Sequence, residues 1–129
     1  MQVLFVEDDA MNRRVVRDML SVAGADMSEA ETAEAGLAMI SEGEYNFVLM
    51  DLRMPGMDGL TAIRHIRARQ DLKSELPIIV VTADTGAKLI EECVAQGADD
   101  VLFKPVAMQD LFDAMGRILA KQASGVAMI

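Results

Sequence analysis

Residues 47–59 read Phe47-Val48-Leu49-Met50-Asp51-Leu52-Arg53-Met54-Pro55-Gly56-Met57-Asp58-Gly59. An unbroken apolar run ends on the carboxylate of Asp51, and a loop with one proline and two glycines follows. Such a run, bounded by turn residues, is typical of a strand buried on both faces, as in a parallel sheet covered by helices. Asp51 is therefore expected at the carboxyl end of a central strand, where open parallel sheets bind their ligands.

The composition limits the class of protein. The chain has 129 residues, 52% of them hydrophobic, which is enough for one domain with a core and too little for two. A single cysteine excludes an internal disulfide and suits a reducing cytoplasm. The net charge of -9 argues against direct binding of nucleic acid and is compatible with binding divalent cations. No apolar run approaches the roughly 20 residues of a membrane span, so we expect a cytoplasmic protein with no membrane contact.

Apolar runs alternate with amphipathic segments along the whole chain. The pattern predicts strands near residues 3–6, 26–31, 45–51, 78–82 and 101–103, with the second at the edge of the sheet because it is polar. It predicts helices near residues 10–23, 32–41, 58–69, 85–96 and 108–121. In the first helix we expect Met11, Val15, Val16, Met19 and Leu20 to face the core, and Arg13 to face solvent.

This alternation predicts one doubly wound α/β domain over residues 1–121, followed by a short, frayed tail at 122–129. Right-handed crossovers bring the carboxyl ends of all its strands to one edge of the sheet. Four of the five predicted strands end there on a polar group, namely Glu7 with Asp8, Asp51, Thr82 and Lys104.

Such a group of side chains has a definite chemistry. Clustered carboxylates need a compensating cation, and oxygen ligands without His or Cys suit Mg²⁺. A divalent ion, an ammonium and a hydroxyl together match the oxygens of a phosphoryl group in transfer, and a central carboxylate is the natural nucleophile. Taken singly, Glu7 or Asp8 is more simply a helix cap, Thr82 a turn hydroxyl and Lys104 a solvated cation. Their joint arrival at one edge favours an aspartyl-phosphate switch.

These residues resemble the receiver domain of two-component response regulators, of the kind found in chemotaxis regulators. The resemblance runs from about residue 3 to residue 121 and rests on Val6-Glu7-Asp8-Asp9, Met50-Asp51 with Met54-Pro55-Gly56-Met57-Asp58-Gly59, Val81-Thr82-Ala83, and Lys104-Pro105. It implies a flavodoxin-like (βα)5 fold with a five-stranded parallel sheet of order 2-1-3-4-5 and helices on both faces.

The resemblance also implies a role for each site residue. Asp51 is the expected phosphoacceptor, and the Mg²⁺ ligands are expected to be Asp8, Asp51, Glu7 through a water molecule, and the backbone carbonyl of Arg53. The phosphoryl oxygens are expected to contact the Thr82 hydroxyl, the Ala83 N–H and Lys104, which a cis bond to Pro105 holds toward the site. Asp9, although adjacent, is expected to be a helix N-cap.

Two features of the sequence concern how phosphorylation changes the protein and how long the phosphoryl group lasts. The family usually places an aromatic residue three positions before the lysine, but this chain has Val101, which is too short for a large rotamer change. Signal is then expected to pass through movement of the loop between Thr82 and the fourth helix. Arg53 and Asp84, two residues past Asp51 and Thr82, are expected to pair across the mouth of the site and hinder hydrolysis.

The implied partners are a histidine kinase or histidine phosphotransfer protein, and a downstream protein that binds the fourth helix, fifth strand and fifth helix. The chain is then a phosphoacceptor that assists its own Mg²⁺-dependent phosphorylation and dephosphorylation, and not an enzyme. Three alternatives remain open. They are an aspartate-nucleophile phosphatase, disfavoured because Arg53 stands where those enzymes have an aspartate; a flavin or nucleotide binder; and a receiver-like scaffold without phosphorylation-dependent switching.

Overall fold

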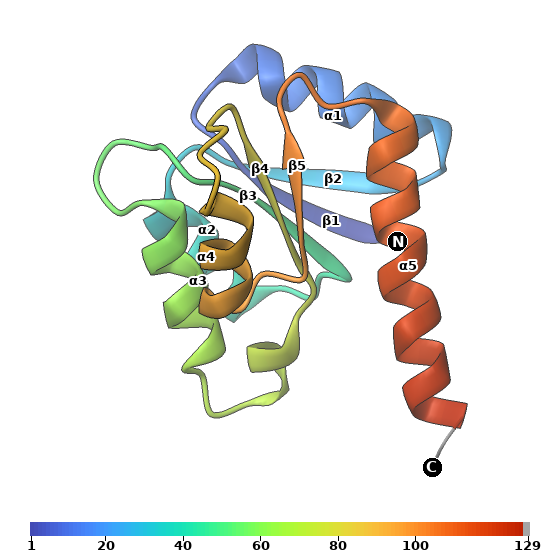
Figure 1. Ribbon diagram of the computed structural model, residues 1–129. Coiled ribbons are helices and arrows are strands. Elements are labelled where there is room, and N and C mark those ends of the chain that lie inside the picture. The colour runs from blue at the N-terminus through green and yellow to red at the C-terminus, as the bar shows by residue number, and fades with distance from the viewer. Residues whose placement is uncertain (128–129) are drawn as a thin grey trace.

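The computed structural model describes residues 1–127, with side chains to residue 123, as strands alternating with helices (Figure 1). The strands are β1 (Gln2–Val6), β2 (Asp26–Ala30), β3 (Phe47–Asp51), β4 (Ile78–Thr82) and β5 (Asp100–Phe103). The helices are α1 (Ala10–Val22), α2 (Ala33–Glu42), α3 (Gly59–Arg67), the 3-10 segment η1 (Leu72–Glu75), α4 (Leu89–Gln96) and α5 (Met108–Ala127). None of the described helices combines the length and apolar content required to cross a bilayer.

The strands form one parallel sheet of order β2-β1-β3-β4-β5, which confirms the predicted doubly wound fold with β2 at an edge. Crossover from β1 outward to β2 and back to β3 places the topological switch point between β1 and β3. Ligands of open α/β sheets bind beside such a point, at the carboxyl ends of the strands. A ligand is therefore expected to bind near the residues that follow β1 and β3.

Helices cover both faces of the sheet, and each face has its own apolar cluster. Alternate strand residues such as Leu4, Val48 and Val80 pack with α2, α3 and α4. Their neighbours, such as Phe5, Leu49 and Val81, pack with α1 and α5. Side chains alternate between the faces because successive strand residues point in opposite directions. Burial on both faces explains why β3 and β4 contain uninterrupted apolar runs.

The inward face of α1 differs from the prediction. Val16 and Leu20 are buried as expected, but Met11 and Val15 are exposed and Arg13 is buried. The buried stripe therefore follows positions 13, 16 and 20, whereas the predicted stripe included 11, 15 and 19 beside 16 and 20. Burial of Arg13 is compensated because its guanidinium donates to the Glu7 backbone carbonyl at 2.8 Å and pairs with Glu29 and Glu31.

Two helix boundaries also differ. The fourth helix begins at Leu89, not near residue 85, because Gly86 disfavours helix and Leu89 is the first side chain that α4 buries. The fifth helix continues to Ala127, past the predicted end at 121, through an alanine-containing segment without proline. Residues 122–127, predicted as frayed tail, are thus helical; residues 128 and 129 lie outside the described part of the chain.

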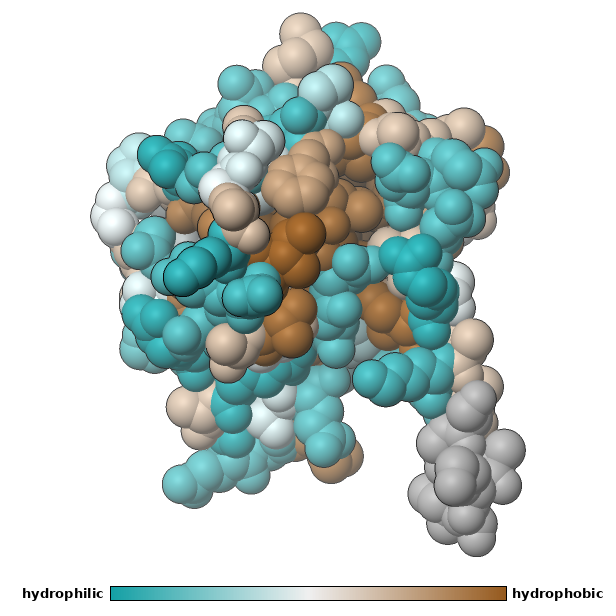
Figure 2. All heavy atoms as spheres, viewed as in Figure 1, coloured by the Kyte–Doolittle hydropathy of each residue, from teal (hydrophilic) through white to brown (hydrophobic). Residues whose placement is uncertain are grey.

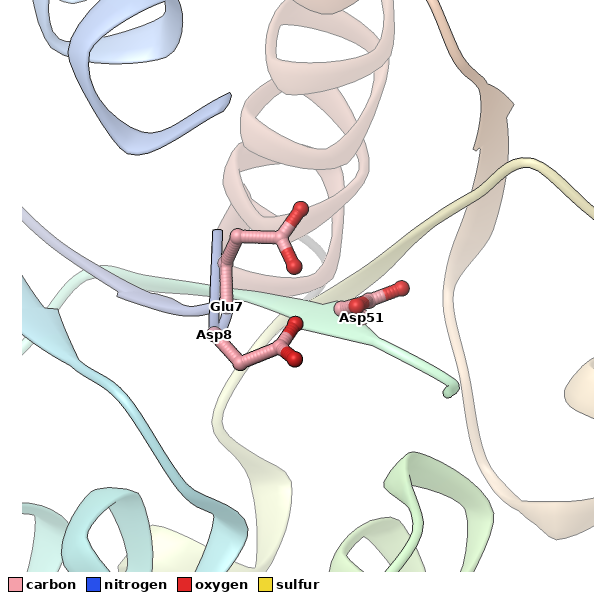
Figure 3. A group of neighbouring side chains, drawn as sticks. All are labelled: Glu7, Asp8 and Asp51. Atoms are coloured by element: carbon pink, nitrogen blue, oxygen red, sulfur yellow. The ribbon is translucent and has the colours of Figure 1, made fainter. Parts of the chain in front are cut away.

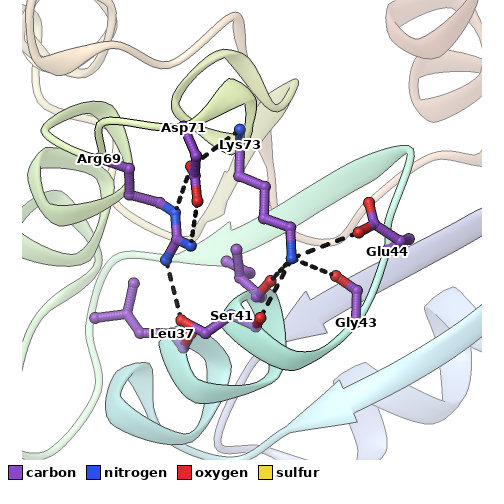
Figure 4. A network of polar contacts seen from close by, with 8 residues as sticks. Leu37, Ser41, Gly43, Glu44, Arg69, Asp71 and Lys73 are labelled. Atoms are coloured by element: carbon purple, nitrogen blue, oxygen red, sulfur yellow. Dashed lines mark hydrogen bonds and ion pairs between the residues drawn. The ribbon is translucent and has the colours of Figure 1, made fainter.

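At the amino-terminal edge of the sheet, where β4 begins, η1 is hydrogen-bonded to the C-terminal end of α2 (Figure 4). Lys73 Nζ donates to the backbone carbonyls of Ile40 at 2.7 Å and Gly43 at 2.9 Å. Carbonyls at a helix C-terminus lack partners within the helix, and an ammonium satisfies them with favourable charge. Arg69, which pairs with Asp71, also donates to the Ser41 hydroxyl. These contacts connect α2 to the segment that leads into β4.

Candidate functional site

The predicted site residues lie at the carboxyl edge of the sheet. The register pairs Val6 with Met50, so Glu7 lies level with Asp51. It pairs Asp51 with Val81, so Thr82 lies one residue beyond Asp51, and Lys104 follows directly after Phe103, the partner of Thr82. The last residues of β3 and β4 and the residues directly after β1 and β5 therefore bring these side chains to one place, as the alternation of the sequence predicts.

Three carboxylates form the acidic part of the site (Figure 3). One oxygen each of Glu7, Asp8 and Asp51 can be chosen so that all three atoms lie within 4.8 Å of one another. Glu7 and Asp51 are buried, whereas Asp8 is exposed at the rim. Asp9 takes no part in this cluster: its side chain accepts from the N–H groups of Met11 at 2.8 Å and Asn12 at 3.1 Å. Its predicted role as the N-cap of α1 is confirmed.

Lys104 neutralises part of this negative charge. Its Nζ lies 2.5 Å from Glu7 Oε1 and 3.3 Å from Asp51 Oδ1. Burial lowers the pKa of the Lys104 ammonium, but its bond to Glu7 and the charge of Asp51 more than offset that effect, so the pKa lies above its ordinary value. Burial, followed by the neighbouring Asp51 carboxylate, raises the pKa of the Glu7 carboxyl, and Lys104 lowers it only in part. One ammonium is therefore shared between two buried carboxylates.

The cluster fits a hard divalent cation. Its donors are all carboxylate oxygens, the ligands that Mg²⁺ prefers. Glu7 Oε2 is buried and has no hydrogen-bond partner among the described residues, although Asn12 and Lys104 both contact Oε1. A buried acceptor of this kind is costly unless an ion or a water molecule satisfies it. Lys104 alone cannot balance three nearby carboxylates, which gives a cation a further electrostatic reason to bind.

Thr82 and Ala83 are placed where the sequence predicts them. Thr82 is buried at the end of β4, and its Oγ1 accepts from the Asp84 N–H at 3.0 Å. The hydroxyl hydrogen is not used in that bond, so the group can still donate to a ligand oxygen. Ala83 is exposed directly after the strand. The roles of the Ala83 N–H and of the Arg53 carbonyl remain predictions.

The predicted ion pair at the mouth is present. Arg53 Nη2 lies 2.7 Å from Asp84 Oδ2, and a groove of about 580 Å³, lined in part by Met54, Leu60 and Leu89, adjoins the pair.

The other predicted residues lie near β5 and on the helices. Val101 is buried in the cluster under α4, opposite Val80, and the Lys104–Pro105 bond is cis as expected. His65 is exposed on α3, and Cys93 is buried.

Two residues of α1 belong to the site without having been predicted. Asn12 donates from Nδ2 to Glu7 Oε1 at 2.9 Å, and Arg13 donates from Nη1 to the Glu7 backbone carbonyl at 2.8 Å. The hydrophobic pattern of α1 assigned Arg13 to the solvent, and nothing in the composition distinguishes Asn12 from a surface residue. The available signal was their position in the first turn of the helix that follows Glu7.

Comparison with known proteins agrees with this geometry. The profile of the response regulator receiver domain family matches residues 3–116. The chain is similar to chemotaxis protein CheY-3 of Vibrio cholerae, with 31% identity over 122 residues that cover 94% of this chain and 93% of that protein. It is 34% identical over 124 residues to response regulator protein FleR of Pseudomonas aeruginosa, covering 96% of this chain but 26% of FleR.

Solved structures share the fold closely. A response regulator receiver protein from Pseudomonas putida superposes with a TM-score of 0.82 at 32% identity, covering 90% of this chain and 95% of the other. The receiver domain of a sensor histidine kinase from Pseudomonas aeruginosa PAO1, solved with a magnesium ion coordinated in its active site cleft, gives a TM-score of 0.81 at 31% identity. It covers 90% of this chain and 94% of that domain.

Proposed function

Because the chain belongs to the response regulator receiver domain family, we propose that Asp51 is the residue on which it accepts a phosphoryl group. The chain is a phosphorelay receiver of two-component signalling, as its relatives are. The observation that carries the assignment to Asp51 is its position: a buried carboxylate at the end of the central strand, 3.3 Å from Lys104 Nζ and within one acidic cluster with Glu7 and Asp8.

The transfer requires little of the protein beyond positioning and charge. A carboxylate oxygen of Asp51 forms a bond to phosphorus while the P–N bond of a phosphohistidine donor breaks and its electron pair returns to the imidazole. Lys104, already at Asp51, turns to a phosphoryl oxygen, and the Thr82 hydroxyl donates to another. The product is an acyl phosphate on Asp51.

Mg²⁺ is the proposed cofactor, held by Asp8, Asp51, Glu7 and the Arg53 backbone carbonyl. The carboxylate cluster, the unpartnered Glu7 Oε2 and the magnesium ion of the Pseudomonas aeruginosa receiver support this assignment. When bound, the ion neutralises charge that develops on the phosphoryl oxygens. We assign self-assisted phosphorylation and dephosphorylation to this site, not turnover of external phosphate esters. Repeated hydrolysis of such an ester would contradict that assignment.

Receiver domains interact with histidine kinases and downstream effectors. We propose that the downstream partner binds the face formed by α4, β5 and α5. There Ile90, Val94 and Phe103 are exposed to 49%, 52% and 40%. Figure 2 shows apolar side chains gathered between the positions of α4 and α5. Amide resonances of these residues should shift on phosphorylation of the unsubstituted protein and stay constant in Asp51→Asn.

We also propose a cytoplasmic location, since the single cysteine leaves the fold independent of any internal disulfide.

The alternative functions, among them an aspartate-nucleophile phosphatase, gain no support. The side chain of Arg53, which stands where an aspartate phosphatase has its second aspartate, is engaged with Asp84.

The decisive experiment is incubation with Mg²⁺ and a small acyl phosphate, followed by intact-mass measurement. The protein should gain one phosphate, and Asp51→Asn, which keeps the shape of the side chain but removes the nucleophile, should gain none. Asp58→Asn makes the same change to an exposed carboxylate at the start of α3 and should still be phosphorylated. Phosphate on Asp51→Asn would overturn the assignment.

A further inference from the structure

Asn12 occupies the first turn of α1 and faces the site. Its side-chain Nδ2 donates to Glu7 Oε1 at 2.9 Å, while its own backbone N–H is held by Asp9 Oδ1 at 3.1 Å. It is half-buried and borders a small cavity of about 90 Å³ that Lys104 and Pro105 also line. The amide therefore joins the capped start of α1 to the buried carboxylate of Glu7.

We propose that Asn12 is a positioning residue for Glu7, which fixes the orientation of that carboxylate by holding Oε1 and so keeps Oε2 available to the cation site. The inference rests on the proposed function, because it takes Glu7 as part of that site. Asn12 itself contacts neither the phosphoryl group nor the cation. Its effect is exerted through one hydrogen bond.

The sheet explains why a residue of α1 can do this. Glu7 continues β1 through the bond of its N–H to the Ala30 carbonyl, so its side chain points to the same face as Val3 and Phe5. That face packs against α1 and α5. Asp51 lies on the same face because it continues the alternation of Phe47 and Leu49. Both buried carboxylates therefore project toward the layer of helices that contains Asn12.

Lys104, the other donor to Glu7, is not available to Glu7 both before and after a phosphoryl group is present. Lys104 bonds Glu7 and also lies 3.3 Å from Asp51, and it must turn toward a phosphoryl oxygen once one is present. Asn12 is then the donor that remains on the Glu7 side chain among the described residues. A carboxylate with one fixed hydrogen bond keeps a defined orientation, whereas without it the carboxylate is free to rotate. Groups that orient ligands in this way commonly contribute 10- to 100-fold to metal affinity.

A purely structural role for Asn12 makes a different prediction. If its amide only supports the first turn of α1, its removal lowers thermal stability and leaves Mg²⁺ affinity unchanged. The two roles are therefore separated by measuring both quantities. Calorimetric titration is suited to the affinity, because the chain contains no tryptophan to report binding by fluorescence.

The test compares Asn12→Ala and Asn12→Leu with the unsubstituted protein, using Mg²⁺ alone as the probe. Alanine removes the donor, and leucine removes it while keeping a branched side chain with the same number of heavy atoms, so one of them suffices if the other fails to fold. Neither substitution changes the net charge. We expect the dissociation constant to rise about 10-fold in both. Asn46→Ala is the matched control, since Asn46 accepts one hydrogen bond from the Gln2 N–H at the opposite edge of the sheet, and it should bind Mg²⁺ normally.

Two outcomes would overturn the inference, and they are distinguishable. Affinities within twofold of the unsubstituted protein in the Asn12 variants would show that the hydrogen bond does not position Glu7. Failure of the unsubstituted protein itself to bind Mg²⁺ would remove the proposed cation site, and the inference with it.

Discussion

Arg53 and Asp84 are joined by an ion pair of 2.7 Å between Nη2 and Oδ2, each two residues beyond a site residue, Asp51 and Thr82. The guanidinium holds the pKa of the Asp84 carboxyl below its ordinary value through a hydrogen bond, and Asp84 raises the pKa of Arg53 in return. The Arg53 side chain is 79% exposed, so the pair lies at the solvent boundary of the site. We predict that the pair hinders the approach of water to Asp51.

Removal of this pair should shorten the lifetime of the phosphorylated protein. In Arg53→Ala, water gains access to the phosphoryl group, and an exposed pair worth about 0–1 kcal/mol limits the acceleration to roughly fivefold. The measurement is the decay of the phosphorylated mass after removal of the donor. Arg14→Ala, which removes the same charge from an exposed position on α1, is the control. An unchanged half-life in Arg53→Ala would refute the gate.

Substitution of Lys104 by methionine should destabilise the protein by about 3–5 kcal/mol. It leaves Glu7 and Asp51 buried without their shared ammonium, and uncompensated buried charge is costly. Mg²⁺ supplies the missing positive charge, so it should stabilise the variant more than it stabilises the unsubstituted protein. Urea unfolding of both proteins, with and without Mg²⁺, measures the difference. Equal stabilisation by Mg²⁺ would show that Lys104 and the cation do not share the same carboxylates.

Lys73→Met should lower the free energy of unfolding by about 2 kcal/mol, because the carbonyls at the end of α2 lose a charged donor (Figure 4). The substitution keeps most of the side-chain volume. Denaturant titration beside Lys88→Met, an exposed lysine before α4, isolates the effect of the contacts from that of the charge. Mg²⁺ affinity should not change, since Lys73 lies at the other edge of the sheet. A stability loss equal to that of Lys88→Met would contradict this account.

Asp58 should contribute a pH-dependent term to stability. The backbone N–H of Thr61 lowers the pKa of this carboxyl below the ordinary value of 3.8, as expected for the N-cap of α3. A lowered folded-state pKa means that the contribution is present above pH 3.8 and is lost as the pH falls through the folded value. Asp58→Asn keeps an acceptor but has no charge, so it should be about 0.5 kcal/mol less stable at neutral pH.

The measurement for Asp58 is the unfolding free energy of both proteins between pH 7 and pH 3. Their difference should begin to shrink as the pH falls below 3.8, because protonation of the aspartate removes its charge advantage over asparagine. A difference that stays constant over that range would show that the charge of Asp58 does not contribute to the cap.

Much of the site was predictable because it depends on chain direction. Apolar runs that end on Asp51, Thr82 and Lys104 must bring those residues to one edge once the strands are parallel. The pairing of Arg53 with Asp84 was predictable for the same reason, since each residue lies two positions beyond the end of one of two neighbouring parallel strands. The helix that begins at Leu89 was less predictable, because its start lacks a side-chain cap and the sequence before it resembles a helical turn.

The sequence by itself determined the order of the strands' apolar runs, the polar group at each strand end, and so the identity of the carboxylates, hydroxyl and ammonium of the site. Only the tertiary structure decided which neighbours orient them: that Lys104 is shared by Glu7 and Asp51, that Asn12 holds the side chain of Glu7, and that Arg13 holds its backbone carbonyl. The physical reason is geometric. A strand end fixes the place of a residue to within one position, whereas a helix turns about 100° per residue, so its rotation, which packing alone sets, decides which side chains reach the site.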